Sequence, residues 1–241
     1  MGAVVGPFLV TGCGRSGSTF TARLLTNVGI RTSHEEFFTS YTPPSTVFAV
    51  EQWLVETKTA GEVSGLAAPW LRLLPVNLTV IHLVRNPVAV IASLMGLRNL
   101  HLEMRYHANI KFNFRYLPQL KHEDDPLILC MKYWLYWNRL VEPCAQYRWQ
   151  VERLQHPLYL RDRLAELGHV WSLEGCEAAI QQSTVADNAG KRDMAVRWNN
   201  TPDSWLKRAI RTAAHNYGYS DADLEDWRPF GISCPCCGAN P

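Results

Sequence analysis

Residues 7–28 read Pro7-Phe-Leu-Val-Thr11, Gly12-Cys-Gly-Arg-Ser-Gly17 and Ser18-Thr-Phe-Thr-Ala-Arg-Leu-Leu-Thr-Asn-Val28. The first segment is a short apolar run, which is typical of a buried parallel strand. The third segment has the apolar spacing of a helix, and Gly29 follows it as a natural helix end. A strand, a glycine-rich loop and a helix form the opening half of a βαβ unit.

The loop in this unit has the spacing of a nucleotide-phosphate loop, with Gly12, Gly17 and Thr19 at the expected positions. Ser18 stands where the nucleoside-triphosphate signature requires lysine, but the backbone N–H groups at a helix N-terminus can still hold a phosphate. Arg15 partly replaces the missing positive charge. The loop therefore predicts an anion site, and a tight turn that binds no ligand is the alternative.

A second strand and helix surround another arginine. The strand is predicted at Leu78–Val84, and Pro87 suits the first position of the helix that follows. Arg85 at the carboxyl end of the strand and Ser93 two turns into the helix can converge on one anion, because ligands bind at that edge of open α/β sheets. A triphosphate-using enzyme more often presents an aspartate there to hold Mg²⁺. The arginine indicates a second phosphate, and a solvated arginine is the alternative.

The rest of the chain alternates helices and strands. Helices are predicted at Pro126–Tyr147 with an interruption at Pro143, and then at Pro157–Gly168, Leu173–Gln182 and Pro202–Tyr217, with a strand at Trp149–Glu152. This order predicts an α/β fold, a single P-loop-type domain whose mostly parallel sheet has helices on both faces. The domain is expected at residues 1–227, with a cysteine-rich tail at 228–241. Trp134, Trp137 and Trp205 lie in helical stretches and are expected in the core.

Composition narrows the class of protein. The 241 residues are 47% hydrophobic and 19% charged, which argues against long disorder, and a formal charge of +2 does not favour nucleic acid as a partner. No secretory signal or membrane span is apparent, so the cytoplasm is the expected location.

Four of the seven cysteines are isolated in apolar stretches and are predicted to be reduced. The Cys234-Pro-Cys-Cys237 run is interpreted as exposed thiols rather than a metal site, and no metal is expected.

Together the two candidate anion sites resemble the sulfotransferase family that uses 3′-phosphoadenosine 5′-phosphosulfate. Gly14-Arg-Ser-Gly-Ser-Thr-Phe20 is similar to the family's loop for the 5′-phosphosulfate, and Leu83-Val-Arg-Asn-Pro-Val-Ala-Val-Ile-Ala-Ser93 is similar to its 3′-phosphate motif. Three further segments resemble bacterial and carbohydrate-type members. They are Ser33-His-Glu-Glu-Phe37, Glu62-Val-Ser-Gly-Leu-Ala-Ala-Pro69, and the Tyr-Trp-x-x-Trp-Asn pattern of Tyr133 to Asn138.

This resemblance implies a role for each residue of the two motifs. Arg15 would contact both the transferring sulfuryl group and the 5′-phosphate. The loop from Gly14 to Phe20, with Ser16, Gly17, Ser18 and Thr19, would hold the 5′-phosphate, and Arg85 with Ser93 would hold the 3′-phosphate. The chemistry would be a metal-independent in-line transfer in which fixed N–H groups and an arginine meet the developing charge.

A base must take the proton of the acceptor as its bond to sulfur forms. The region Val63–Leu66 has no histidine where cytosolic members of the family carry theirs. His34-Glu35-Glu36 follows the first helix by a short connection that can return it to the site. Glu35 is the first choice of base, Glu36 the second and His34 the third. Surface charges at a helix start are the alternative.

Lys191-Arg192 lies where the family often has a loop that closes over the nucleotide, but the family's form of that loop is missing, so Arg192 is either a contact of the 3′-phosphate or a solvated charge. The expected acceptor is a small molecule or a carbohydrate, without a nucleic acid or membrane partner. A small-molecule or nucleotide kinase and a catalytically silent nucleotide-binding module remain the alternatives to a sulfotransferase.

Overall fold

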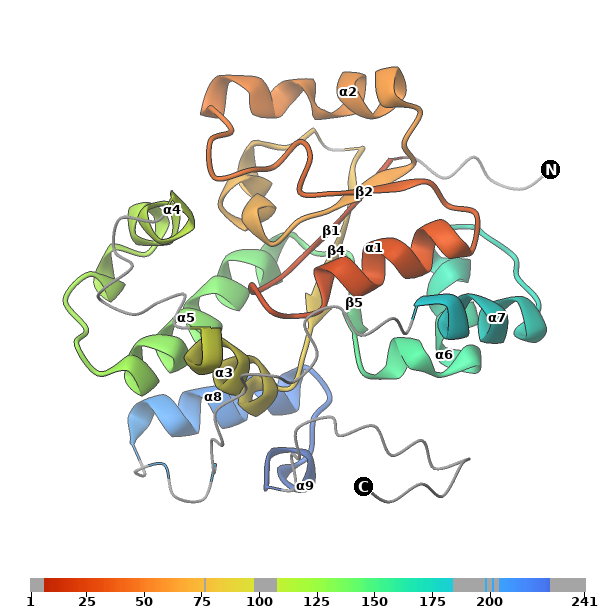
Figure 1. Ribbon diagram of the computed structural model, residues 1–241. Helices are drawn as coiled ribbons and strands as arrows, with labels where there is room; N and C mark the ends of the chain where they lie inside the picture. Colours follow the sequence, from red (N-terminus) through yellow and green to blue (C-terminus); the bar gives the residue numbers. More distant parts are fainter. Residues whose placement is uncertain are drawn as a thin grey trace.

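The computed structural model describes residues 7–75, 77–97, 108–183, 198, 201 and 204–225. Its strands form one five-stranded sheet in the order β2-β3-β1-β4-β5, and every neighbouring pair is parallel (Figure 1). The strands are β1 (Phe8–Thr11), β2 (Thr32–His34), β3 (Gly61–Val63), β4 (Thr79–Val84) and β5 (Tyr147–Gln150). The predicted α/β fold with a parallel sheet is confirmed.

The sheet brings the predicted site segments to one edge. β1 lies between β3 and β4, and Val10 pairs with Val63 on one side and with Ile81 on the other. All five strands run in the same direction, so the residues that follow Thr11, His34, Val63, Val84 and Gln150 lie at the same carboxyl edge. In this order β2 and β3 lie on one side of β1, and β4 and β5 lie on the other. Open α/β sheets bind ligands at such a switch point.

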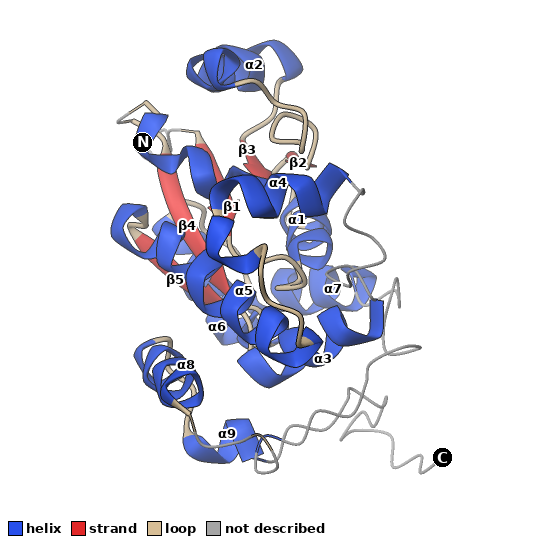
Figure 2. Ribbon diagram, turned by 90° about the vertical axis from the view of Figure 1, so that its left-hand side faces the viewer, coloured by secondary structure: helices blue, strands red, loops and turns tan. Residues whose placement is uncertain are grey.

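Helices cover both faces of the sheet, as expected (Figures 1 and 2). In β4, Val80 and Val84 belong to one hydrophobic cluster and Ile81 and Leu83 to the other, as the alternation of a strand requires. The first cluster includes side chains of α3 (Pro87–Leu97), α5 (Pro126–Val141) and α8 (Trp205–Asn216). The second includes side chains of α1 (Ser18–Asn27), α6 (Pro157–Glu166) and α7 (Leu173–Ser183).

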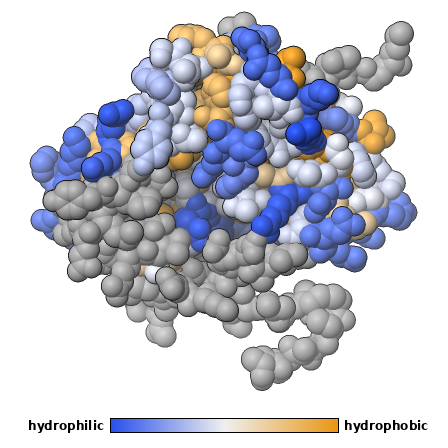
Figure 3. All heavy atoms as spheres, turned by 45° about the horizontal axis from the view of Figure 1, so that its top comes forward, coloured by the Kyte–Doolittle hydropathy of each residue, from blue (hydrophilic) through white to orange (hydrophobic). Residues whose placement is uncertain are grey.

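Shorter elements connect these layers. They are η1 (Pro44–Ala49), α2 (Val50–Thr57), η2 (Gly65–Leu73), α4 (Ala108–Tyr116), η4 (Pro118–Leu120), η5 (Glu142–Cys144), η6 (Arg153–Gln155) and α9 (Asp221–Glu225). Tyr41, Phe48 and Val55 are strongly exposed in and before η1 and α2. Figure 3 shows hydrophobic side chains on the surface near the top of that view, with hydrophilic ones beside them.

Two local expectations concern the end of the helix near Pro143 and the burial of three tryptophans. The helix from Pro126 ends at Val141, and a 3-10 turn that contains Pro143 follows, as the proline predicts. Trp134 and Trp137 are fully buried, but the expectation for Trp205 is wrong, because this first residue of α8 is 54% exposed while the buried face of the helix is formed by Leu206 and Ile210.

The described residues include four of the seven cysteines. Cys13, Cys130 and Cys176 are free and buried, and Cys144 is free and half-buried. Among the described residues, no helix has the length and the apolar character that crossing a membrane requires. The Cys234-Pro-Cys-Cys237 run lies outside the described residues.

Candidate functional site

The loop after β1 needs glycine for steric reasons. A Cβ atom at Gly12 would lie 2.0 Å from the carbonyl oxygen of Leu83, so the loop can pass the end of β4 only without a side chain there. Gly17 has a φ of 87°, in the left-handed region that glycine tolerates. Arg15 also has a positive φ, 71°, although it is not glycine. Strained residues of this kind gather at ligand sites, which supports a functional role for this loop.

The start of α1 has the properties of an anion site. Its N-cap residue, Gly17, has no side chain that could accept a hydrogen bond from the first N–H groups. The first turn of the helix also holds no acidic residue. The first N–H groups of a helix lack partners within the helix, and its dipole favours negative charge there. The Ser16 hydroxyl beside them is buried and has no hydrogen-bond partner in the described structure. A phosphate-type ligand can satisfy these donors.

Ser18, Thr19 and Phe20 begin α1 in different environments. Ser18 is half-buried and Thr19 is exposed, so both hydroxyls are accessible at the helix start. Phe20 packs against the hydrophobic cluster between α1 and the sheet. Its side chain therefore anchors the helix, and only its backbone N–H remains for a ligand.

Arg15 joins the two predicted anion sites. Its Nε donates a hydrogen bond of 3.0 Å to Ser93 Oγ in α3. Arg85 at the end of β4 donates from Nη1 to the carbonyl oxygen of Arg15, also at 3.0 Å. Ser93 is buried, and both arginines are half-buried. Sequence spacing predicted two separate sites, and the structure brings their residues into one connected cluster.

Asn86 fixes the strand end that carries Arg85. Its Oδ1 accepts hydrogen bonds from the N–H groups of Val88 and Ala89 and so caps α3. Its own N–H donates to Glu152 Oε1 at 2.9 Å, and Tyr219 donates its hydroxyl to the other oxygen of Glu152 at 2.7 Å. Sequence reasoning missed Glu152 and Tyr219, because only the sheet order brings them to this edge.

The candidate bases lie where β2 ends. His34 Nε2 is 3.0 Å from Ser18 Oγ and 3.5 Å from Thr19 Oγ1, so the imidazole lies at the start of α1. Glu35 is half-buried, has a φ of 53°, and donates its N–H to the carbonyl of Val63. Glu36 is exposed. The structure thus brings His34 into contact with the phosphate loop and turns Glu35 and Glu36 to different environments.

Glu62 anchors the segment that carries these residues. Its side chain is 0% exposed in β3, and its carboxylate accepts hydrogen bonds from the N–H groups of Phe37 and Phe38 and from Ser33 Oγ. Burial raises the pKa of this carboxyl, although these donors oppose the rise. Sequence reasoning gave Glu62 no role. The signal that could have found this residue is a single carboxylate between Ala60-Gly61 and Val63.

Two further predictions concern Arg192 and the absence of a metal site. Arg192 lies outside the described residues. Within residues 7–75, 77–97, 108–183 and 204–225, no three histidine, cysteine, aspartate or glutamate side chains gather in a way that could hold a metal ion.

Comparison with known proteins gives one structural similarity. No family model matches the sequence, and no curated protein matches it either. Among solved structures, the chain is similar to the sulfotransferase domain from the Synechococcus PCC 7002 olefin synthase, with 16% sequence identity and a TM-score of 0.49. The similarity covers 89% of this chain and 95% of that domain.

Proposed function

We propose that this protein transfers a sulfuryl group from 3′-phosphoadenosine 5′-phosphosulfate to a hydroxyl or amine of a small-molecule or carbohydrate acceptor. The observation that carries the proposal is the cluster in which Arg15 meets both Ser93 and Arg85 at the carboxyl edge of the sheet. Two arginines in one site suit a donor with two phosphates, because each guanidinium can pair with a phosphate. Ser18 in place of the loop lysine also favours this donor over a nucleoside triphosphate.

The residues of the site fit such a donor. The start of α1, with Ser16, Ser18 and Thr19, would hold the 5′-phosphate, because it offers uncapped N–H groups and a buried hydroxyl without a partner. Arg85 and Ser93 would hold the 3′-phosphate. Arg15, in the loop before α1, would contact the sulfuryl group, with its guanidinium held by Ser93.

Transfer requires a base and charge stabilisation. A bond forms between the acceptor oxygen or nitrogen and sulfur, while the bond between sulfur and the bridging phosphate oxygen breaks and the bisphosphate leaves. Glu35 would accept the proton that the acceptor loses. The backbone N–H groups at the start of α1 and Arg15 would stabilise the charge that develops on the leaving group.

Thermal shift measurements test the proposal directly. Adenosine 3′,5′-bisphosphate should raise the melting temperature without added metal, and adenosine 5′-monophosphate should raise it much less, because it leaves Arg85 and Ser93 without a phosphate. Equal shifts for both nucleotides would remove the case for a 3′-phosphate site. ATP with Mg²⁺ as the better ligand would favour a kinase. Binding without transfer of sulfur-35 to any of a mixture of acceptors would favour a silent module.

A further inference from the structure

Three polar side chains of α5 connect this helix to β4 and to the segments that follow β1 and β3. The Tyr133 hydroxyl accepts a hydrogen bond of 3.3 Å from the N–H of Gly14, in the loop after β1. Trp137 donates from Nε1 to the carbonyl of Gly65 after β3, and Asn138 Oδ1 lies 2.9 Å from Nε2 of His82 in β4. These residues belong to the Tyr-Trp-x-x-Trp-Asn pattern, so the pattern fixes α5 across the sheet.

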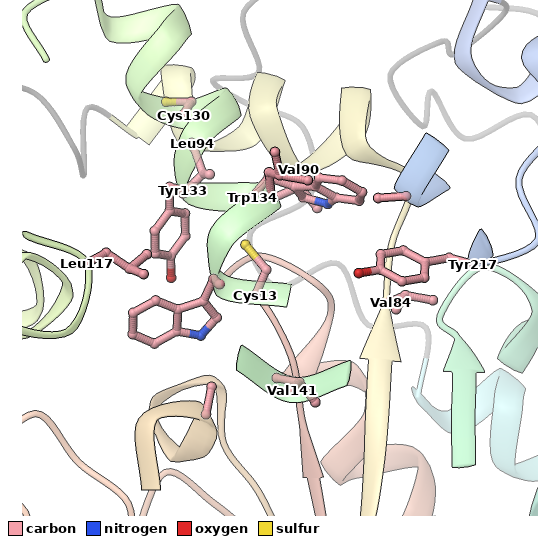
Figure 4. Close-up of a cluster of buried hydrophobic side chains, with 14 of the residues drawn as sticks. Cys13, Val84, Val90, Leu94, Leu117, Cys130, Tyr133, Trp134, Val141 and Tyr217 are labelled. Carbon is pink, nitrogen blue, oxygen red and sulfur yellow. The ribbon is translucent and has the colours of Figure 1, made fainter. Parts of the chain in front are cut away.

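Tyr133 lies closest to the phosphate loop. Its side chain is 4% exposed, and Tyr133 and Cys13 belong to the same buried cluster, part of which Figure 4 draws. A Cβ atom at Gly14 would lie 3.0 Å from the Tyr133 hydroxyl, which leaves little room for any side chain at that position. Burial, and then the neighbouring Cys13, raise the pKa of this phenol well above its usual range, so it keeps its proton. The hydroxyl therefore acts as a neutral hydrogen-bonding group.

Two amides of the loop are bound within the protein. Gly14 donates to Tyr133, and Ser16 donates to the carbonyl of Cys13 at 3.2 Å. Both bonds turn N–H groups toward the protein and shape the loop before α1 begins. The amides at the start of α1 are then the ones placed to bind a ligand.

We propose that Tyr133 is a positioning residue that holds the phosphate loop in the shape that binds the donor's 5′-phosphate. The inference rests on the proposed function for the identity of the ligand, but the hydrogen bond between Tyr133 and Gly14 does not. Tyr133 would act through the loop backbone, without touching the reacting atoms.

The first test combines Tyr133→Phe with two nucleotides. This change removes the hydroxyl and keeps the ring, so we expect adenosine 3′,5′-bisphosphate to bind about 3- to 10-fold more weakly, the usual effect of losing one hydrogen bond. Affinity for adenosine 3′-monophosphate, which lacks the 5′-phosphate, should be nearly unchanged. Tyr136→Phe, in the same helix, is the matched control and should change neither affinity.

Hydrogen exchange of the free protein supplies a readout independent of ligand. Amides of residues 12–17 should exchange faster in Tyr133→Phe by about tenfold, while those of α5 stay as protected as in the wild type. Gly14→Ala gives the reciprocal test, because its methyl group would press on the Tyr133 hydroxyl. It should weaken bisphosphate binding, and adding Tyr133→Phe should restore part of the loss.

These measurements separate the possible failures. Unchanged exchange of residues 12–17 in Tyr133→Phe would overturn the role of Tyr133. Equal weakening of both nucleotides would overturn it as well, since that result indicates a general structural defect. A wild-type protein that binds no bisphosphate would instead overturn the proposed function, and exchange would still decide whether Tyr133 holds the loop.

Discussion

Arg15 Nε and Ser93 Oγ lie 3.0 Å apart, although 78 positions separate the two residues in the sequence. This bond links the loop after β1 to the second turn of α3. Arg85 closes the same cluster from β4 by donating to the carbonyl of Arg15. Arg15 therefore connects the 5′-phosphate half of the proposed donor site to its 3′-phosphate half. The residues of each half help to hold those of the other half in place.

Arg15 and Ser93 should contribute jointly to donor binding. We expect Arg15→Ala and Ser93→Ala each to weaken binding of adenosine 3′,5′-bisphosphate. In the double variant the losses should fall short of their sum by about 0.5–3 kcal/mol, because each residue orients the other. Titration calorimetry of the four proteins measures this coupling. Arg15→Ala combined with Ser45→Ala, in the exposed η1 segment, should be additive. Full additivity for Arg15 and Ser93 would show that the two halves act separately.

Arg85→Ala should weaken bisphosphate binding by about 2–4 kcal/mol, since the change removes a charged partner from a bound phosphate. The fold should survive, because Arg85 is a half-buried residue at the end of a strand. Arg148→Ala is the matched control. It removes the same charge from β5, where Arg148 lies over the Tyr217 ring, and should leave bisphosphate affinity unchanged. Normal affinity in a folded Arg85→Ala protein would refute the 3′-phosphate assignment.

The local parts of this fold were predictable from the sequence. Residues 7–28 specify a strand, a loop and a helix through apolar spacing and glycines, and β4 with α3 follows from the same signals. The contacts of Tyr133, Glu62 and Glu152 were not predictable, because each of these side chains reaches another strand or loop in an order that the sequence does not state. Trp205 shows the same limit, since a tryptophan in a helical pattern does not reveal which side of the helix meets the core.

His82 should make stability depend on pH. It is buried in β4, and burial, only partly opposed by Asn138, lowers its pKa from 6.5 to about 4. The folded protein therefore keeps His82 neutral at pH values where the unfolded chain protonates it. Its contribution to stability is present above pH 6.5 and is lost as the pH falls toward 4.

Denaturant unfolding of wild type and His82→Gln measures this effect. The free energy of unfolding of the wild type should fall by about 3 kcal/mol more than that of the variant between pH 7 and pH 4. His215→Gln is the control, because His215 is exposed and lies 3.1 Å from Asp221. Parallel pH profiles for wild type and His82→Gln would contradict a depressed pKa at this site.

The last prediction concerns the base. Glu35→Gln keeps the shape of the side chain and removes its ability to accept a proton, so transfer of sulfur-35 from the donor to acceptors should slow by about 10²–10⁴-fold. Affinity for adenosine 3′,5′-bisphosphate should stay within about threefold, because the change affects the chemical step and leaves the donor contacts in place. Glu36→Gln should have little effect, since Glu36 is exposed. His34→Gln should instead weaken donor binding, because the imidazole contacts Ser18 and Thr19 at the start of α1. Near-full turnover in Glu35→Gln, with turnover abolished in Glu36→Gln or His34→Gln, would move the base to a neighbouring position and leave the donor site as proposed.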